Sequence, residues 1–402
     1  MSFDQLNVIE TGGGIAGPLV GRALRDLGAN VVKLESRRRL DFGRTRVPPP
    51  GKTSEHVHAS PSVHDLHAGK ASVTVNLKTE LGRTIFVDMT SKADVYVDTY
   101  APGWLERIGL SYESFQERNP QLIILSQSAY GTMGPKRDQR AYAPIMTALA
   151  GLESTVGYQD GRTVSQVSSA VGDLVAGHFG ILLVLSALYS RQSTSRGTIL
   201  DMSQIEASVA IAGIAFAEYG LTGETPGPRG NAHPMHVPHG LYRVAGDDQW
   251  VSLAICSDDD WSSLCDSLGL SEAVRREYQS TELRLQARDE IDQLVTKALA
   301  SWSRDEVVEA LQAAGIPCTP VLSIYEADRF APLVDRGLWE DVQHPSIESL
   351  RLTGIPWRFD SLEAQCRGWA DGVGASTDHI LRQWLGATDQ QLESWHAAGA
   401  LE

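Results

Sequence analysis

The stretch "ETGGGIAGP", residues 10–18, follows the largely apolar run Leu6–Ile9. Its glycines at positions 12, 14 and 17 spell G-x-G-x-x-G, and Glu35 lies 18 residues past the last of them. In a Rossmann unit such glycines permit a tight turn and close approach of the backbone to a pyrophosphate, while the acid binds ribose. The stretch therefore predicts a strand, a turn and a helix. The turn either binds a phosphate-bearing ligand or is only a tight connection between the strand and the helix.

Two neighbouring features bear on which ligand the turn would hold. Pro18 directly follows the third glycine, and three arginines, Arg37–Arg39, lie just beyond Glu35. Arginines at that place suit a ligand with an additional phosphate on its ribose, such as NADP or coenzyme A (CoA). The residues alone leave both open.

The first 200 residues alternate between strand-like and helix-like segments. Strands are expected at residues 7–10, 30–34, 72–77, 94–98 and 121–126. Helices are expected at residues 18–28, with Pro18 in the first position, and at 79–92, 111–118, 173–190 and 204–220. This alternation indicates an α/β domain with a mostly parallel sheet. Residues 36–70 show little periodicity and are interpreted as a long loop.

A segment rich in glycine and proline, "TGETPGPRGNAHP" at 222–234, marks a domain boundary. A hairpin at 240–244 and 249–255, a run of helices and a strand at 315–323 follow it, which favours a smaller α+β domain. We expect a large Rossmann-like domain at 1–205, the small domain at 225–325, and a C-terminal segment at 333–402 that returns to the large domain.

Composition narrows the class of protein. The net charge of −15 over 402 residues argues against nucleic acid or an acidic membrane as partner, so an anionic ligand needs a local basic patch. The four cysteines are far apart, which indicates neither disulfides nor zinc. The N-terminus has no apolar signal region, and the most apolar stretch, 179–188, is about half a bilayer span. We expect a cytoplasmic enzyme.

Histidines gather in two places. His233, His236 and His239 are spaced by three, and four more lie between residues 56 and 67. Pro234 and Pro238 prevent a regular helix that would present the first group to a metal. We expect no metal site, and expect His233 or His236 to line a substrate pocket instead.

Beyond the opening stretch, long segments resemble the class III CoA-transferases, the family of formyl-CoA and carnitine-CoA transferases. The resemblance rests on "IAGP" with "LGANVVKLES", on "GKASVTVNLKTELGR" (69–83), on "ADVYVDTYAPGWLERIGL" (93–110), on "VGDLVAGHFGILLVLSALYSRQSTSRGTILDMSQIEA" (171–207) and on "PHGLYRVAGDDQWVSLAI" (238–255). It implies a Rossmann-like domain that binds CoA, an interlocked homodimer, an acyl-CoA donor, a carboxylic acid acceptor and no permanently bound cofactor.

The resemblance places the nucleophile of the family on Asp173, in "VGDLVAG". CoA exchange between two acids needs a carboxylate that attacks a thioester, and the N-terminus of a helix is expected to keep such a carboxylate ionised. Without the resemblance, Asp173 would more simply be a helix cap.

The resemblance also implies CoA contacts. Ile15 corresponds to a family residue near the thioester, Arg37 and Arg107 match contacts at the adenosine phosphates or the adenine, and Arg140 matches a basic residue. Val75 and Lys78 lie along the CoA tail, and Thr99 and Tyr100 depart from the Asn-Phe that relatives have beside the pantetheine. The implied contacts are Ile15, Arg37, Val75, Lys78, Thr99, Tyr100, Arg107 and Arg140. For each arginine the alternative is a solvated surface charge, and this alternative is strongest for Arg38 and Arg39.

Two departures narrow the function within the family. Racemases of the family use a histidine upstream of the aspartate, but no histidine occurs between His67 and His178, so racemisation lacks its base. Formyl-CoA transferase has a run of glycines where this chain has "GNAHPMHVPHG" (230–240), which argues against oxalate as acceptor.

Three hypotheses remain. The first is a CoA-transferase that forms aspartyl anhydride and aspartyl-CoA intermediates on Asp173. The second is an NAD(P)-dependent oxidoreductase using the Gly12, Gly14 and Gly17 turn, which lacks a credible hydride-transfer pair such as Tyr-x-x-x-Lys. The third is a non-catalytic CoA-binding homologue, against which the intact Asp173 argues. A racemase-like enzyme is the alternative inside the family.

Overall fold

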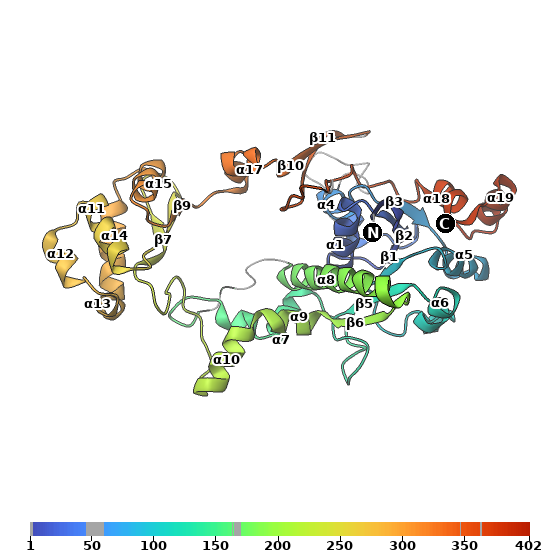
Figure 1. Ribbon diagram of the computed structural model, residues 1–402, viewed down its shortest axis with the longest axis horizontal. Coiled ribbons are helices and arrows are strands. Elements are labelled where there is room, and N and C mark those ends of the chain that lie inside the picture. Colours follow the sequence, from blue (N-terminus) through green and yellow to red (C-terminus); the bar gives the residue numbers. More distant parts are fainter. Residues whose placement is uncertain (1–2, 46–59, 163, 165–169, 346, 362–363) are drawn as a thin grey trace. The chain divides into compact units, whose positions relative to one another are not determined.

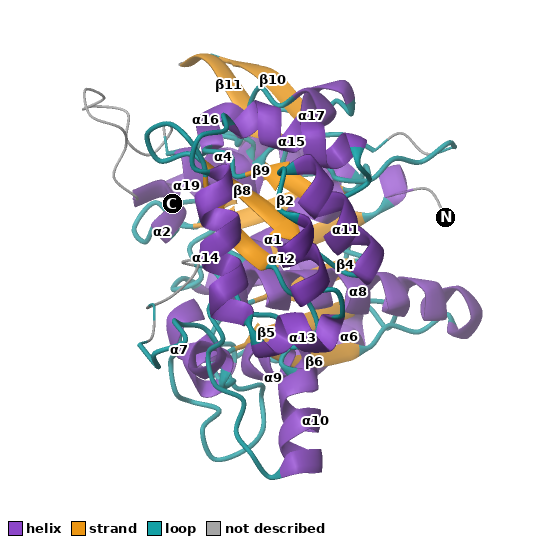
Figure 2. Cartoon of the chain, turned by 90° about the vertical axis from the view of Figure 1, so that its left-hand side faces the viewer, coloured by secondary structure: helices purple, strands orange, loops and turns teal. Residues whose placement is uncertain are grey.

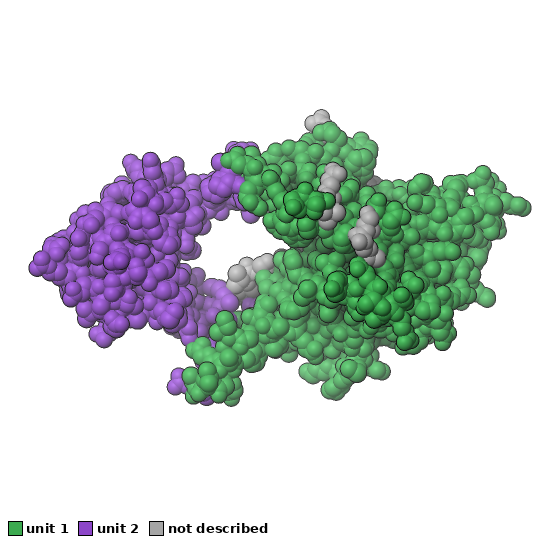
Figure 3. Space-filling model, viewed as in Figure 1, with its two compact units in different colours: residues 1–152, 168–222, 334–402 green, residues 153–167, 223–333 purple. Residues whose placement is uncertain are grey.

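The computed structural model describes residues 3–45, 60–162, 164, 170–345, 347–361 and 364–402. The chain forms two compact units, shown in green and purple in Figure 3. Unit 1 comprises residues 1–152, 168–222 and 334–402, and unit 2 comprises 153–167 and 223–333. The sequence analysis had placed segment 153–167 in the large domain. In the structure it groups with unit 2, where the backbone N–H of Gly230 donates to the carbonyl of Gly157.

Within the described residues, unit 1 is built on a six-stranded sheet whose strands all pair in parallel. The strands are β1 (Asn7–Thr11), β2 (Asn30–Glu35), β3 (Ala71–Thr74), β4 (Val95–Asp98), β5 (Ile123–Ser128) and β6 (Ile199–Ser203). Their order is β3-β2-β1-β4-β5-β6, that of a doubly wound dinucleotide-binding fold. The expected α/β class with a parallel sheet is confirmed.

Helices cover both faces of this sheet (Figure 1). Alternating side chains of the strands are buried against these helices. Val8, Val95 and Leu125 point to the face covered by α1 and α8, while Ile9 and Tyr96 point to the face covered by α5, α6, α18 and α19. The helices of unit 1 are α1 (Ala16–Asp26), α2 (Phe42–Thr45), α4 (Pro61–His67), α5 (Glu80–Thr90), α6 (Tyr112–Arg118), α7 (Ala143–Leu149), α8 (Val171–Thr194), α9 (Gln204–Ile211), α10 (Gly213–Thr222), α18 (Thr377–Leu385) and α19 (Asp389–Ala397).

Three expectations about these helices were wrong in detail. Helix α1 begins at Ala16, so Pro18 is its third residue and not its first. The helix expected over 204–220 is two helices, α9 and α10, which meet at an angle of 63°. The expected loop at 36–70 contains α2 and α4, and its residues 46–59 lie outside the described part.

Glycines let α1 and α8 approach closely. A Cβ added to Gly177 would lie 2.7 Å from Leu19 Cδ2 and 3.1 Å from the Ala16 carbonyl oxygen, and one added to Gly180 would lie 2.8 Å from Val20 Cγ2. Since Gly177 faces the start of α1 and Gly180 faces its next turn, the two helices run in the same direction. Their N-termini therefore lie at the same edge of the sheet, the edge at which the parallel strands end.

By length and composition, helix α8 as a whole is also long and apolar enough to cross a membrane, whereas the stretch 179–188 alone is about half a bilayer span. The helix has 24 residues and a mean hydropathy of 1.9 in its best window, of which 39% is buried. One side packs on α1, while Leu174, Leu182 and Tyr189 on the remainder are exposed. Length and composition alone do not distinguish a membrane segment from a core helix whose outer face another chain covers.

The C-terminal segment covers the free edge of the sheet. Strand β3 is an edge strand, and its N–H groups find acceptors in this segment. Ser72 N–H donates to the Asp371 carboxylate at 3.1 Å, and Thr74 N–H donates to Thr377 Oγ1 at 3.0 Å. An antiparallel hairpin of β10 (Trp339–His344) and β11 (Ile347–Thr353) belongs to the same segment. The edge is thus protected against pairing with another chain.

Unit 2 combines a small antiparallel sheet with helices, shown in orange and purple in Figure 2. In the described residues its strands are β7 (His239–Arg243), β8 (Trp250–Ala254) and β9 (Cys318–Pro320), in that order across the sheet. Helices α11 (Asp258–Ser267), α14 (Arg288–Leu299) and α15 (Arg304–Ala313) share its core around Trp261, with α12 (Glu272–Glu277), α13 (Thr281–Gln286), α16 (Ile324–Ala327) and α17 (Ala331–Asp335) in addition. This is α+β architecture.

Candidate active site

The glycine turn after β1 is shaped by contact with the loop after β4. Gly12 and Gly14 have φ of +84° and +92°, which L side chains rarely adopt. A Cβ on Gly12 would lie 2.1 Å from Thr99 Oγ1, and one on Gly17 would lie 2.3 Å from Thr99 Cγ2. The turn and Thr99 therefore meet between β1 and β4, where the strand order reverses and where open α/β sheets bind ligands.

Backbone N–H groups of this turn are available to an anion. Among the described residues, no hydrogen bond has the N–H of Gly13, Gly14 or Ile15 as its donor. Ile15 is the N-cap residue of α1, and its side chain cannot accept from the first turn of that helix. Unpaired N–H groups at the start of a helix favour phosphate or carboxylate.

Glu35, the acid that would bind ribose in a dinucleotide enzyme, is occupied. Its carboxylate oxygens accept from Arg44 Nε at 2.8 Å and from Arg44 Nη2 at 2.7 Å, and Ser72 Oγ donates to it at 2.6 Å. All three side chains are buried. The carboxylate that the NAD(P) hypothesis requires is therefore tied into the core.

The four cationic residues implied as CoA contacts are exposed. Arg37, Lys78, Arg107 and Arg140 lie in unit 1, and within its described residues none of them forms an ion pair. Arg38 contacts Glu402, as expected for a surface charge. The four therefore remain available to phosphates.

The uncharged residues implied as CoA contacts differ in whether their side chains can reach a ligand. Thr99, in the loop after β4, lies against the glycine turn, and its hydroxyl donates to the Gly13 carbonyl at 3.4 Å. The Tyr100 ring packs edge-on against Trp104, at 4.8 Å between centroids. Val75 belongs to the core around Phe86, so its side chain cannot reach a ligand and only its backbone could.

Asp98 is a site residue that the sequence did not single out. It is fully buried at the end of β4, and it accepts hydrogen bonds from Tyr100 N–H at 2.8 Å, from Tyr112 OH at 2.7 Å and from Trp104 Nε1. Burial raises its pKa, while these bonds oppose the rise. The carboxylate thereby fixes the loop that carries Thr99. Arg39, expected to be a surface charge, is exposed.

Asp173 is the third residue of α8, whose N-cap position is held by Ala170. Its side chain does not cap the helix, and among the described residues no hydrogen bond reaches its carboxylate. Burial raises its pKa to about 6. With this pKa the carboxyl group is still mostly ionised at pH 7, although burial opposes the favourable end of the helix.

The fold brings Asp173 to the same edge of the sheet as the glycine turn. Positions 173 and 177 are one helical turn apart on one face of α8, and Gly177 packs against the Ala16 carbonyl at the start of α1. A half-buried carboxyl group whose pKa burial raises to about 6 thus lies at the same edge of the sheet as the unpaired N–H groups. Such a group is a candidate nucleophile.

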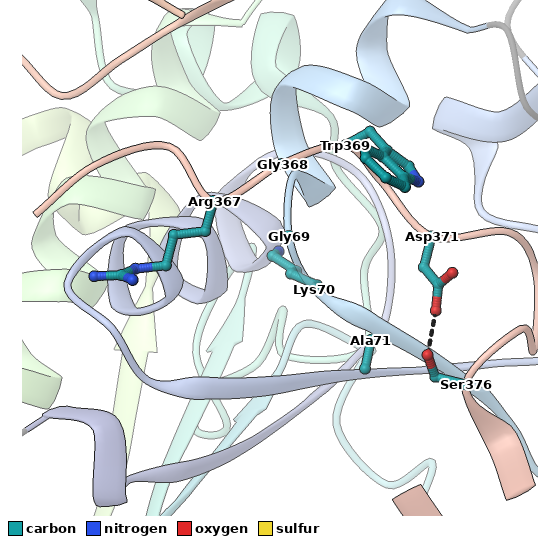
Figure 4. A pocket seen from close by; sticks show the side chains of 8 residues that line it. All are labelled: Gly69, Lys70, Ala71, Arg367, Gly368, Trp369, Asp371 and Ser376. Atoms are coloured by element: carbon teal, nitrogen blue, oxygen red, sulfur yellow. Dashed lines mark hydrogen bonds between the residues drawn. The ribbon is translucent and has the colours of Figure 1, made fainter. Parts of the chain in front are cut away.

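A hollow on unit 1 lies between β3 and the C-terminal segment (Figure 4). It has a volume of about 270 Å³ and is open to solvent. It is lined by Gly69, Lys70, Ala71, Arg367, Gly368, Trp369, Asp371 and Ser376. Asp371 accepts from Ser376 Oγ and from Ser72 N–H, so this carboxylate secures the sheet edge. None of the expected site residues lines this hollow.

In unit 2, the rings of the three spaced histidines lie close together. The His233 and His236 rings lie 4.4 Å apart and nearly parallel, and His239 lies 4.9 Å from His233. Partial burial and the neighbouring histidines and arginines lower the pKa of His233. Arg288 fixes the segment by donating to the His233 carbonyl at 2.7 Å. Across the residues described, no group of His, Cys, Asp and Glu side chains is placed to hold a metal.

Comparison with known proteins shows which protein family the chain is similar to. The model of CoA-transferase family III matches residues 3–377. Acetyl-CoA:oxalate CoA-transferase of Acetobacter aceti is 32% identical over 81% of this chain and 82% of its own length. The alpha subunit of succinyl-CoA–L-malate CoA-transferase of Chloroflexus aurantiacus is 27% identical over 96% of this chain and 90% of its own. The crystal structure of a CAIB/BAIF family protein from Brucella suis superposes with a TM-score of 0.86 at 26% identity, covering 95% of this chain and 99% of that one.

Proposed function

Since this chain belongs to CoA-transferase family III, we propose that it moves CoA from an acyl-CoA thioester to a carboxylic acid through covalent intermediates on Asp173. The class of enzyme follows from the family and from the CoA-transferases that the chain resembles. The observation that carries the mechanism is the position of Asp173, a carboxyl group of near-neutral pKa on the turn of α8 next to the start of α1.

The chemistry proceeds in balanced steps. The ionised Asp173 carboxylate attacks the thioester carbonyl, the C–S bond breaks, and a mixed anhydride forms as CoA thiolate leaves. The thiolate then attacks the Asp173 carbonyl of the anhydride, releasing the donor acid and leaving an aspartyl-CoA thioester. The acceptor carboxylate attacks this thioester to form a second anhydride. The returning thiolate attacks the acceptor carbonyl of that anhydride, which gives the new acyl-CoA and restores the carboxylate.

We place the thioester end of CoA at the glycine turn, close to Asp173, and the CoA phosphates on the exposed cations of unit 1. On a chain with a net charge of −15, a ligand rich in phosphate needs a local cationic surface. The exposed cations Arg37, Lys78, Arg107 and Arg140 supply it. No cofactor needs to stay bound, because CoA enters and leaves as part of the substrates.

A small dicarboxylic acid is the acceptor that we propose. The relatives named above act on oxalate and on L-malate, both of which carry two carboxyl groups. The sequence analysis had argued against oxalate because the glycine run of formyl-CoA transferase is missing. A 32% identical oxalate enzyme weakens that argument, and oxalate becomes one of the acids to test.

A screen would test the proposed function. Acetyl-CoA and succinyl-CoA are each incubated with the enzyme and with oxalate, malate, glutarate or a monocarboxylic acid, and products are identified by mass spectrometry. We expect CoA to appear on a dicarboxylic acid, and the amount of free CoA to stay constant because the thioester energy is conserved. Hydrolysis without transfer, or α-carbon exchange in deuterium oxide without transfer, would instead indicate a thioesterase or a racemase.

We also propose that the enzyme is a homodimer, of the interlocked kind that the family resemblance implies. Helix α10 is almost entirely apolar and exposed: Ile214 is 86% exposed and Leu221 is 88% exposed, with Phe216 and Tyr219 beside them. The outer face of α8 adds Leu182 and Tyr189. Soluble monomers rarely expose such a surface, and a second copy of the chain would cover it.

Introducing charged side chains on α10 should change the oligomeric state. We expect a dimer by sedimentation at micromolar concentration, and monomers for the double variant Ile214→Asp/Leu221→Asp, because two carboxylates would be buried at the interface. Ile324→Asp, at an isoleucine that is 89% exposed in α16, is the matched control and should remain dimeric. A monomeric wild type would contradict the proposal, and co-sedimentation with lipid vesicles would assign the face to a membrane.

We place the enzyme in the cytoplasm. All four cysteines lie in the described residues and are free thiols, three of them buried, as is common in a reducing compartment.

A further inference from the structure

The small sheet of unit 2 has one face packed on helices and one face that is accessible. Side chains alternate between the two faces, and Tyr242, Val251 and Cys318 point into the core that α11, α14 and α15 share. Their neighbours along the strands therefore point to the other, outer face. On that face Leu241 is 45% exposed, and Thr319 is exposed as well.

A hollow lies on this outer face. It has a volume of about 330 Å³, is open to solvent, and is lined by Ser252, Leu253, Ala254, Pro317, Cys318 and Thr319. Because Leu253 and Cys318 point into the core, they line the hollow with backbone atoms, and the small side chains of the other four residues form its floor. A volume of this size is at the lower end of the range for ligand pockets.

The histidine trio, His233, His236 and His239, borders the hollow. His239 is directly opposite Ala254 in the β7–β8 pair, and the side chains of such a pair lie on the same face of the sheet. Since Ala254 lines the hollow, the His239 side chain lies beside it. The short distances between the three rings bring His233 and His236 to the same place.

Two rings of the trio have unused hydrogen-bond donors. Partial burial and the neighbouring histidines and arginines lower the pKa of His233, and its Nδ1 accepts from Met235 N–H at 3.2 Å. A neutral ring whose Nδ1 accepts carries its proton on Nε2, so the Nε2–H of His233 is free to donate. Within the described residues, neither nitrogen of His236 has a hydrogen-bond partner, and its Nδ1 is buried.

The acidic group near the trio is already in use. The Asp292 carboxyl group interacts with His239 and Arg288, but it accepts a hydrogen bond from Tyr242 OH at 2.5 Å. Burial raises the pKa of Asp292, which opposes a full negative charge there. Among the residues that the structure describes, no ion pair involves a ring of the trio. An anion from outside would therefore meet donors and no competing carboxylate partner.

A second anion-binding group lies farther along β7. Arg243 is on the outer face, four residues beyond His239, which is about 13 Å along the strand. Its side chain is exposed, and within the described part of the chain its guanidinium group forms no ion pair and no hydrogen bond. Leu241 lies between the two on the same face, directly opposite Ser252 of the hollow. An apolar side chain thus separates two groups that attract anions.

We infer that this face of unit 2 binds a small aliphatic dicarboxylic acid, with one carboxylate at the histidine trio, the other at Arg243, and the methylene groups over Leu241. Imidazole N–H groups and a planar guanidinium group form charge-assisted hydrogen bonds with carboxylates. A monocarboxylic acid would engage only one end. All of these residues belong to unit 2, so the inference goes beyond the proposed function and does not depend on it.

Titration calorimetry on the full chain without CoA tests the site. The probes are glutarate, pentanoate, which has the same number of carbon atoms and one carboxylate, and the uncharged glutaramide. We expect wild type to bind glutarate about tenfold or more tightly than pentanoate, because the second carboxylate adds a charge-assisted contact. Glutaramide should not bind measurably, since it carries no negative charge.

Two variants address the two ends of the site. Arg243→Gln removes the charge of an exposed side chain, and His233→Asn keeps an acceptor for Met235 N–H but lacks the outward donor. Each should bind glutarate about tenfold more weakly than wild type, and Arg243→Gln should no longer distinguish glutarate from pentanoate. Arg276→Gln is the matched control, because this arginine of α12 has a side chain that is 77% exposed and lies outside the sheet, and it should bind glutarate as wild type does.

Nuclear magnetic resonance locates the bound acid, since an acceptor site for an acid elsewhere on the enzyme would also produce heat. In protein labelled with ¹³C-histidine, glutarate should shift the ring signals of the trio and leave that of His396, on α19, unchanged. Single histidine variants assign the signals.

Three results would overturn the inference: no binding of glutarate at millimolar concentration, binding without a shift of the trio signals, or equal glutarate affinity in Arg243→Gln and wild type. A wild type that binds glutarate here but transfers CoA to no acid would overturn the proposed function and leave this site standing.

Discussion

Replacement of Asp173 by alanine is expected to abolish CoA transfer in a chain that still folds and binds CoA. Without the carboxylate no anhydride can form, and loss of a nucleophile costs on the order of 10⁴-fold or more in rate. Alanine removes no recorded hydrogen bond within the described residues and no helix cap. The measurement is the rate of transfer with the donor and acceptor found in the screen, alongside the melting temperature and the affinity for CoA. Transfer near the wild-type rate by the folded variant would rule out the mechanism.

A chemical trap gives a second readout of the same residue. Hydroxylamine added during turnover should convert the aspartyl-CoA thioester of the wild type into a hydroxamate on the peptide that contains Asp173. Asp201, a carboxylate that is already bonded to the Thr132 hydroxyl at 2.6 Å, provides the internal comparison and should remain unmodified. A hydroxamate found on another peptide would move the nucleophile elsewhere.

The pKa of Asp173 also sets a pH dependence. With its pKa raised to about 6, kcat/KM for the donor should fall as pH drops through 6, since only the carboxylate attacks. For stability the sign is opposite. A carboxyl group whose pKa is higher in the folded state than its ordinary 3.8 stabilises the fold while protonated, and this contribution is lost as pH rises from about 4 through 6. Asp173→Asn should therefore be more stable than wild type at pH 7, and this difference in stability should be smaller at pH 4.

The main strands and helices of unit 1 could be predicted from the sequence. Alternation between apolar strands and amphipathic helices follows from local spacing, and the strands that it predicted pair in the expected parallel sheet. The break between α9 and α10 was missed because both helices are apolar on nearly all sides, so no change of face marks where one ends. The start of α1 was misplaced because Pro18 is tolerated anywhere in a first turn.

The candidate site was predictable only in part. Glycines and arginines favoured a phosphate-bearing ligand, which stays a prediction, and the family resemblance assigned the nucleophile to Asp173. Neither indicated the environment of these residues. That Glu35 is neutralised by Arg44, that Asp98 gathers Tyr100 and Tyr112, and that Lys33 holds Gly12 all depend on long-range contacts across the sheet. The one local signal was a lysine in the middle of an apolar strand, which a search for buried charge would have found.

The second large effect is expected at Gly17, where the G-x-G-x-x-G pattern meets Thr99. A Cβ there would lie 2.3 Å from Thr99 Cγ2, so Gly17→Ala should push the Thr99 loop away from the turn. We expect a loss of about 1–3 kcal/mol of unfolding free energy, as for other overpacked positions, together with weaker binding of CoA. Denaturant unfolding and CoA titration measure the two effects.

Thr99→Ser supplies the rescue that makes this prediction specific. Serine lacks the methyl group that the new Cβ would strike but keeps the hydroxyl that donates to the Gly13 carbonyl, and the next contacts of the Cβ are at 3.5 Å, an ordinary van der Waals distance. The double variant Gly17→Ala/Thr99→Ser should therefore recover most of the stability and CoA affinity, while Thr99→Ser alone should change little. If the double variant remained as impaired as Gly17→Ala, the third glycine would be required for contact with the ligand itself, and not for closing the turn against β4.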